Sequence, residues 1–207
     1  MNPIISLTAL AAAALLFAAT PAAHADAVFD NLASAQDGSD PVFGYGPLAD
    51  SFTNGAASWL TSVSARLANG SPDIVGMLRF SLHADGANNN PGAELALLGT
   101  LSSAAVGASF ANYGFAPSTP VALSAGTRYW IEIEALSPNA VAWSWSADLG
   151  ATGVSGEFNY SALLGSSSNA SFAPYQMAVT VTPVPEPASA LLAALGLATL
   201  MAAARRR

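Results

Sequence analysis

The fold is decided by the stretch Tyr129-Trp130-Ile131-Glu132-Ile133-Glu134, in which apolar and polar side chains alternate. In an extended chain Ile131 and Ile133 share one face, opposite Trp130, Glu132 and Glu134. The same period of two recurs in residues 59–67, 78–83 and 176–182. Because no convincing helical stripe accompanies it, this alternation predicts antiparallel sheets with one face in solvent.

Clusters of Gly, Pro, Asn and Ser separate these runs and are typical of turns. One of them is Asp85-Gly86-Ala87-Asn88-Asn89-Asn90-Pro91-Gly92, and shorter ones lie at residues 69–72 and 124–127. We therefore expect an all-β fold over residues 26–182, an antiparallel β-sandwich or jelly-roll of about eight to ten strands.

Residues 26–182 are strongly acidic, with 12 Asp or Glu residues against 3 arginines, a net charge of −9. Such a surface repels nucleic acid, whose binding depends on Lys and Arg. The chain has no cysteine, which excludes thiolate catalysis and cysteine-ligated metals. Nucleic-acid binding is therefore excluded, and packing alone must hold the core together.

Residues 1–25 have the pattern of a signal peptide read by the Sec translocon. An apolar run over residues 4–20 ends at Pro21, and Ala23-His24-Ala25 follows with small residues where signal peptidase cleaves. We expect a signal helix, cleavage after Ala25 and Asp26 as the mature N-terminus. The first residues lack Lys and Arg, which departs from the usual pattern, and the alternative is a buried N-terminal helix of the fold.

The C-terminal segment has three parts in order. A short linker over residues 183–187 contains Pro185-Glu186-Pro187, and residues 188–204 follow without a charge. As a transmembrane helix these residues would be about 25 Å long, at the short end of what crosses a bilayer. Arg205, Arg206 and Arg207 close the chain and should stay in the cytoplasm, so that residues 26–187 lie outside.

This tail closely resembles the PEP-CTERM sorting signal, carried by Pro185-Glu186-Pro187, the Ala/Leu-rich span and the terminal arginines. The resemblance implies a substrate of an exosortase, a membrane protease-transpeptidase of Gram-negative bacteria that make extracellular polysaccharide. It also implies a transient inner-membrane anchor, with removal of the tail and delivery of the domain to the outer surface or the extracellular space. A permanent single-pass anchor is the alternative, although a marginal span suits a transient one better.

The domain between the two ends resembles the choice-of-anchor R family. The matching residues are Phe29-Asp30-Asn31-Leu32, Ser51-Phe52-Thr53, the segment 78–92, Leu123, Gly126-Thr127, Tyr129-Trp130, Trp143-Ser144 and Met177-Ala178-Val179. The resemblance implies a β-rich domain combined with different C-terminal anchors, and it carries no assigned chemistry.

No set of catalytic residues stands out. His83 is the histidine of the mature domain, and without a Gly-x-Ser-x-Gly elbow we interpret it as an exposed residue at a strand end. Glu132 and Glu134 point the same way from one strand, whereas a glycosidase needs carboxylates that flank a cleft. We therefore predict no catalytic residues and no enzyme activity.

Calcium is a possible cofactor, because Asp37, Asp40 and Asp85 lie in polar loops that offer oxygen ligands. The favoured alternative is that these side chains form Asx-turns with their own backbone. We expect no other metal and no other cofactor.

Tryptophans raise the question of glycan binding. Trp143 and Trp145 share a face, either as a platform for a sugar or, as we favour, within the core. Trp130 is the better candidate for an exposed glycan contact, together with Glu132 and Glu134. The sequence thus favours a non-enzymatic surface or matrix protein associated with exopolysaccharide or biofilm, and the alternative is an exported carbohydrate-binding module or glycan-active enzyme.

Overall fold

A computed structural model of the chain describes residues 24–184 together with residues 196, 201 and 204. The predicted signal helix with Ala23, and most of the predicted membrane helix, lie outside the described residues. So do Pro185, Glu186, Pro187, Arg205, Arg206 and Arg207. Within the part that is described, no helix is both long and apolar enough to cross a membrane.

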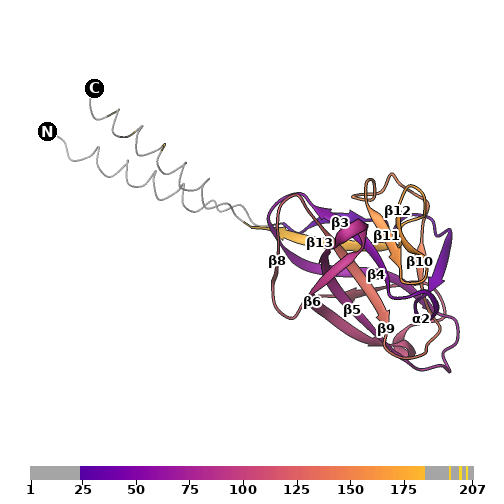
Figure 1. Ribbon diagram of the computed structural model, residues 1–207. Coiled ribbons are helices and arrows are strands. Elements are labelled where there is room, and N and C mark those ends of the chain that lie inside the picture. Colours follow the sequence, from indigo (N-terminus) through magenta and orange to yellow (C-terminus); the bar gives the residue numbers. More distant parts are fainter. Residues whose placement is uncertain (1–23, 185–195, 197–200, 202–203, 205–207) are drawn as a thin grey trace.

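Two antiparallel sheets form the domain (Figure 1). The first has the order β1-β13-β4-β10-β2, and β7 and β8 also pair with β4. The second has the order β12-β11-β3-β9-β5-β6. The strands of the first sheet are β1 (Asp26–Asp30), β2 (Gly38–Pro41), β4 (Ser58–Asn69), β7 (Ala111–Phe115), β8 (Val121–Leu123), β10 (Val141–Trp145) and β13 (Met177–Pro183). Those of the second are β3 (Leu48–Asn54), β5 (Met77–Asp85), β6 (Pro91–Ser102), β9 (Thr127–Ala135), β11 (Phe158–Ser161) and β12 (Gly165–Ser168).

The predicted all-β, two-sheet architecture is confirmed. The described residues form a seven-stranded and a six-stranded sheet, more strands than expected, because short strands such as β2, β8 and β12 lie in stretches that look like loops. Three short helices complete the domain: α2 (Val42–Tyr45), η1 (Ala87–Asn89) and η2 (Ser103–Ala105).

The core lies between the sheets and is built by the alternating residues that the sequence pattern identifies. Ile131 and Ile133 of β9 are fully buried, as are Phe80 of β5 and Val179 of β13. The Phe80 ring stacks on Phe115 of β7 with 3.7 Å between centroids, which joins the two sheets. Burial of these apolar surfaces is the main force that stabilises the sandwich.

The outer face of β9 differs from the prediction. Trp130 is fully buried instead of exposed, because the loop after β5 folds back over this face of the second sheet. The Trp130 indole Nε1 donates to Asp85 Oδ1 at 2.8 Å, and Arg128 Nη1 donates to Asn89 Oδ1 at 3.0 Å. The prediction of Trp130 as an exposed glycan contact is therefore wrong.

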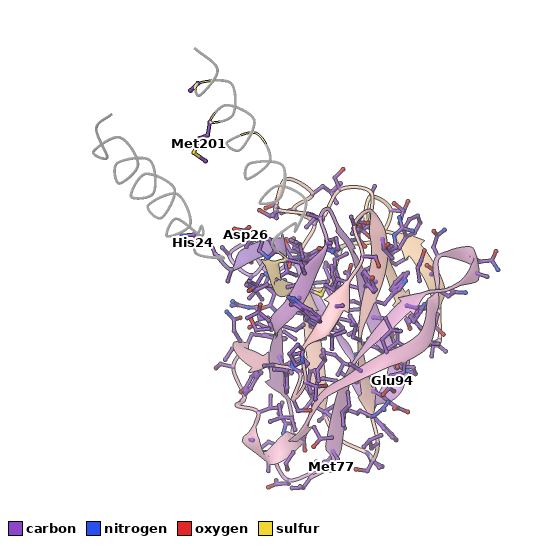
Figure 2. All side chains as sticks on the ribbon, turned by 90° about the vertical axis from the view of Figure 1, so that its left-hand side faces the viewer. His24, Asp26, Met77, Glu94 and Met201 are labelled. Atoms are coloured by element: carbon purple, nitrogen blue, oxygen red, sulfur yellow. The ribbon has the colours of Figure 1, made fainter. Side chains whose placement is uncertain are left out.

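Both ends of the domain lie at one end of the sandwich. Asp26, the first residue of β1, pairs with Val181 near the end of β13. In Figure 1 the chain leaves the domain there, whereas α2, β10, β11 and β12 lie on the far side. Seen from the side of the chain ends, Asp26 and Met77 lie at opposite edges of the domain (Figure 2).

Candidate functional site

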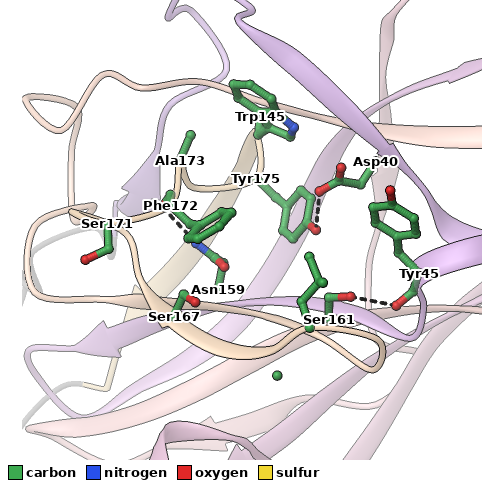
Figure 3. A pocket seen from close by; sticks show the side chains of 12 residues that line it. Asp40, Tyr45, Trp145, Asn159, Ser161, Ser167, Ser171, Phe172, Ala173 and Tyr175 are labelled. Atoms are coloured by element: carbon green, nitrogen blue, oxygen red, sulfur yellow. Dashed lines mark hydrogen bonds between the residues drawn. The ribbon is translucent and has the colours of Figure 1, made fainter.

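A pocket of about 540 Å³ (Figure 3) is lined by elements that lie on the far side of the sandwich from the chain ends in Figure 1. Its walls come from β2 and α2, the end of β10, the β11–β12 hairpin and the segment before β13. The volume lies within the range of about 300–1,000 Å³ that is usual for small-molecule sites. The lining residues include Asp40, Tyr45, Trp145, Asn159, Phe172 and Tyr175.

The Trp145 indole is positioned by a glycine on the neighbouring strand. Trp145 pairs with Gly38 of β2, and a Cβ atom at Gly38 would lie 2.1 Å from Trp145 Cζ2. Any other residue at position 38 would therefore force the rigid indole to move. The absence of a side chain lets the ring lie against the β2 backbone at the side of the pocket (Figure 3).

Trp143 and Trp145 have different environments although they lie two positions apart and share one face of β10. Trp143 is fully buried, stacks on Tyr175 with 4.6 Å between ring centroids, and donates from Nε1 to the Gln176 carbonyl at 2.9 Å. Core packing is confirmed for Trp143. Trp145, at the end of β10, is half-buried and lines the pocket.

A phenol and a carboxylate meet inside the pocket. The Tyr175 hydroxyl donates to Asp40 Oδ2 at 2.8 Å (Figure 3). Burial raises the pKa of Tyr175, and the negative charge of Asp40 raises it further, so the phenol keeps its proton and remains a donor. Asp40 Oδ1 accepts no hydrogen bond from the residues that the structure describes, which leaves it available to a ligand.

A buried carboxyl group anchors the pocket wall. Asp50 of β3 is fully buried and accepts hydrogen bonds from Asn169 Nδ2 at 3.1 Å and from the Tyr175 backbone N–H at 2.6 Å. Asn159 Nδ2 in turn donates to Asn169 Oδ1 at 3.2 Å and to the Phe172 carbonyl at 2.9 Å. This network fixes the segment from residue 169 to residue 175 against the second sheet.

Asp50 makes the stability of the domain depend on pH. Burial raises the pKa of Asp50 well above its usual value, and the charge of Glu157 acts in the same direction. A raised pKa means that the folded state binds the proton more tightly than the unfolded state. The stabilisation is complete below the unfolded pKa near 3.8 and is lost as the pH rises through the folded pKa.

Replacement of Asp50 by Asn is expected to change the pH profile of unfolding. At pH 4 Asp50→Asn should be less stable than the wild type by about 1–3 kcal/mol, because both carboxyl oxygens of Asp50 accept from N–H groups and an amide nitrogen cannot accept. As the pH rises to 8, the wild type should lose stability relative to Asp50→Asn, which carries no charge to bury. Urea unfolding at pH 4, 6 and 8 measures this difference, and a difference that stays constant with pH would contradict the assignment.

The predicted calcium candidates are not brought together. Asp37 accepts from the Ala147 backbone N–H at 2.7 Å, and Asp40 is bonded to Tyr175 as described. Asp85, in the other sheet, accepts from Trp130 and has Oδ2 3.9 Å from Arg128 Nη1. No group of three His, Cys, Asp or Glu side chains that could hold a metal occurs between residues 24 and 184. Calcium binding stays a prediction that nothing here tests.

Glu132 and Glu134 lie among charged neighbours on the outer face of the second sheet. Glu132 Oε1 lies 3.5 Å from His83 Nε2, and Glu134 Oε2 lies 4.0 Å from Arg79 Nη1. Arg79 also donates to Glu94 at 2.5 Å, at the edge of the domain in Figure 2. Desolvation by burial raises the pKa of Glu132. The charge of His83 lowers this pKa, and the charge of Glu134 raises it. The two glutamates share a face as predicted, but Trp130, which was predicted to be exposed beside them, is buried.

His83 is not the exposed residue that the sequence suggested. Its side chain is 11% exposed, and its ring nitrogens lie 3.0 Å from Ser81 Oγ and 3.0 Å from the Gly92 carbonyl. The segment that follows β5 and leads into β6 provides this cover. His83 therefore serves the packing of the β5–β6 connection.

Sequence reasoning missed most of the pocket, including Tyr45, Asn159, Phe172 and Tyr175. They come from three distant parts of the chain, and none belongs to a recognisable motif. The one available signal was Trp145, whose position at the end of an alternating run leaves it less covered than Trp143.

Comparison with known proteins identifies the C-terminal segment. A PEP-CTERM protein-sorting motif matches residues 183–207. The motif indicates an exported protein that an exosortase recognises and sorts at the membrane. No curated protein matches the chain. The PEP-CTERM motif covers the tail alone, so the resemblance of residues 29–181 to the choice-of-anchor R family stays a prediction.

Proposed function

We propose that this PEP-CTERM protein is a non-enzymatic surface or extracellular-matrix protein associated with exopolysaccharide. The observation that carries the proposal is the sorting motif at residues 183–207, which begins at the last residue of β13. After export through the Sec translocon and removal of the signal peptide, the tail holds the precursor transiently in the inner membrane. Exosortase then removes the tail, and the β-sandwich reaches the outer surface or the extracellular space.

The ends of the sandwich support processing on both sides. The expected signal cleavage after Ala25 falls directly before β1, and Val184, just after β13, donates from its backbone N–H to the Ala57 carbonyl at 3.0 Å. Cleavage near Pro185-Glu186-Pro187 therefore removes none of the strand residues that the structure describes. The folded domain keeps its core and its sheet hydrogen bonds after both cuts.

A second candidate function is an exported carbohydrate-binding module. The pocket with Trp145, Tyr45 and Asp40 favours it over a glycan-active enzyme, since Glu132 faces His83 instead of a cleft. The two candidates are compatible, because a matrix protein can be retained through a glycan site.

Fractionation of the native cells tests the proposed function. We expect to recover the domain in the exopolysaccharide fraction. Its intact mass should be that of a chain that begins at Asp26 and ends near Val184 or Glu186. In a strain without exosortase the protein should stay in the inner-membrane fraction with residues 188–207 attached. Recovery of the full chain from Met1 to Arg207 in the cytosol would overturn the proposal.

A further inference from the structure

We propose that the pocket at the far end of the sandwich binds a neutral saccharide. The inference deepens the proposed function and rests on it, since it assumes that the exported domain meets polysaccharide. It assigns the contact to Asp40, Tyr45, Trp145, Asn159 and Phe172, and not to the outer face of β9.

The aromatic residues of the pocket suit the apolar face of a sugar ring. Trp145 and Tyr45 are half-buried, and Phe172 is 60% exposed at the rim. Large aromatic groups that remain accessible offer flat apolar area while their positions are fixed by the fold. Gly38 fixes Trp145 in this way, and the Asp50–Asn169–Asn159 network fixes the segment that carries Phe172. A ligand would therefore meet a site that needs little rearrangement.

The polar residues of the pocket suit hydroxyl groups, which both donate and accept hydrogen bonds. Asp40 Oδ1 can accept, and the hydroxyls of Tyr45, Ser167 and Ser171 line the same space without a hydrogen-bond partner among the described residues. A site with a few convergent polar groups among aromatic ones is the usual form of a small-ligand site. Several hydrogen-bond donors and acceptors around these aromatic residues match a polyhydroxylated ring better than an apolar ligand.

The charge of the pocket selects a neutral sugar over an anionic one. Asp40 is the charged residue of the lining, and no arginine lines the pocket. Arg79 and Arg128 lie in the second sheet and pair with Glu94 and Glu157. An acidic domain with an unneutralised carboxylate in its pocket repels uronic-acid, sulfated or phosphorylated glycans.

The position of the pocket suits a protein tethered by its C-terminus. From beside Tyr175, β13 runs toward the chain exit over seven residues, about 23 Å at roughly 3.3 Å per residue. The elements that form the pocket, α2, β10, β11 and β12, lie on the side of the domain away from the chain exit (Figure 1).

Binding to a glycan array tests the proposal on the full-length chain, solubilised in a detergent without a sugar headgroup. The array carries neutral hexose and N-acetylhexosamine oligosaccharides beside oligosaccharides of uronic acids. We expect retention on at least one neutral oligosaccharide and none on the uronic-acid probes. Trp145→Ala should weaken binding at least tenfold, and Phe172→Ala, at an exposed position that leaves folding intact, should weaken it several-fold.

Trp59→Ala is the matched control, because Trp59 is 41% exposed on the same sheet but lies at the end of β4 that pairs with Thr182. It should bind as the wild type does. Gly38→Ala keeps every aromatic ring but displaces Trp145, so it should also weaken binding. The proposal would be overturned if the wild type bound uronic-acid probes alone or no probe at all. It would also be overturned if the Trp145→Ala, Phe172→Ala and Trp59→Ala variants bound equally well.

The two proposals fail in different experiments. If Trp145→Ala and Phe172→Ala stay in the exopolysaccharide fraction of native cells and keep full array binding, the pocket assignment fails and the matrix function stands. If the wild type binds a neutral oligosaccharide on the array but is absent from that fraction, the pocket assignment stands and the matrix function fails.

Discussion

Replacement of Pro185-Glu186-Pro187 by three alanines is expected to abolish removal of the C-terminal tail. Proline disfavours a helix at its own position and at the one before it, so the sequence predicts an extended tripeptide, the form that a protease binds. Three alanines favour a helix continuous with the one that the sequence predicts over residues 188–204, and they also remove the carboxylate of Glu186. The exported protein should then keep residues 188–207 and remain with the inner membrane.

Intact mass of the protein from membrane and extracellular fractions measures this effect. The processed form should fall from the main species in the wild type to below detection in the variant. Pro183→Ala is a suitable control, since it changes the proline at the end of β13, outside the tripeptide, and should be processed normally. Equal processing of the triple-alanine variant and the wild type would exclude a role for the tripeptide in cleavage.

Replacement of Trp143 by Ala is expected to cause the largest loss of stability from a single substitution. Trp143 is fully buried, stacks on Tyr175 and donates a hydrogen bond to the Gln176 carbonyl. Truncation of such a side chain costs about 3–5 kcal/mol. For a domain of this size the midpoint of thermal unfolding should fall by about 10 °C.

Thermal and urea unfolding followed by circular dichroism measure the loss. Trp59→Ala again provides the control, because an exposed side chain of the same type should cost less than about 1 kcal/mol. Since Tyr175 lines the pocket, Trp143→Ala should also loosen the pocket wall. Equal midpoints for the two tryptophan variants would contradict the packing described for Trp143.

The strands were predictable because their signal is local. In β4, β5, β9 and β13 the residues that face the core recur at every second position, and Leu78, Phe80 and Leu82 are buried as this pattern requires. The alternation identifies the inner face of a strand from a few consecutive residues. The same alternation also predicts the antiparallel two-sheet architecture.

The environment of the outer face was not predictable from the same pattern. Alternation places Trp130 and His83 on the side away from the core, but it contains no information about a loop that folds back over them. The polar residues 85–92 were recognised as a turn. Their contacts with Arg128 and Trp130 depend on residues about 40 positions away.

The pocket depends even more on contacts between distant residues. Asp40, Trp145 and Tyr175 meet only because β2 pairs with β10 and β13 starts beside them. Gly38 matters because it leaves room for the indole of Trp145. In the sequence it is one glycine in a polar stretch, and nothing there indicates that Trp145 packs against it. Sequence reasoning reached Trp145 but could not identify what surrounds it.

The placement of β13 has a mechanical consequence. This strand lies between β1 and β4, antiparallel to both, and its last residues lead straight into the tail. A tension applied between the C-terminal end of β13 and the opposite end of the domain would run along β13 and load its two rows of hydrogen bonds, to β1 and to β4, in shear at the same time. Strands loaded in this direction must break many bonds together, whereas a strand peeled from an edge breaks them one by one. β13 is therefore placed to resist a pull applied to the C-terminal end of the domain.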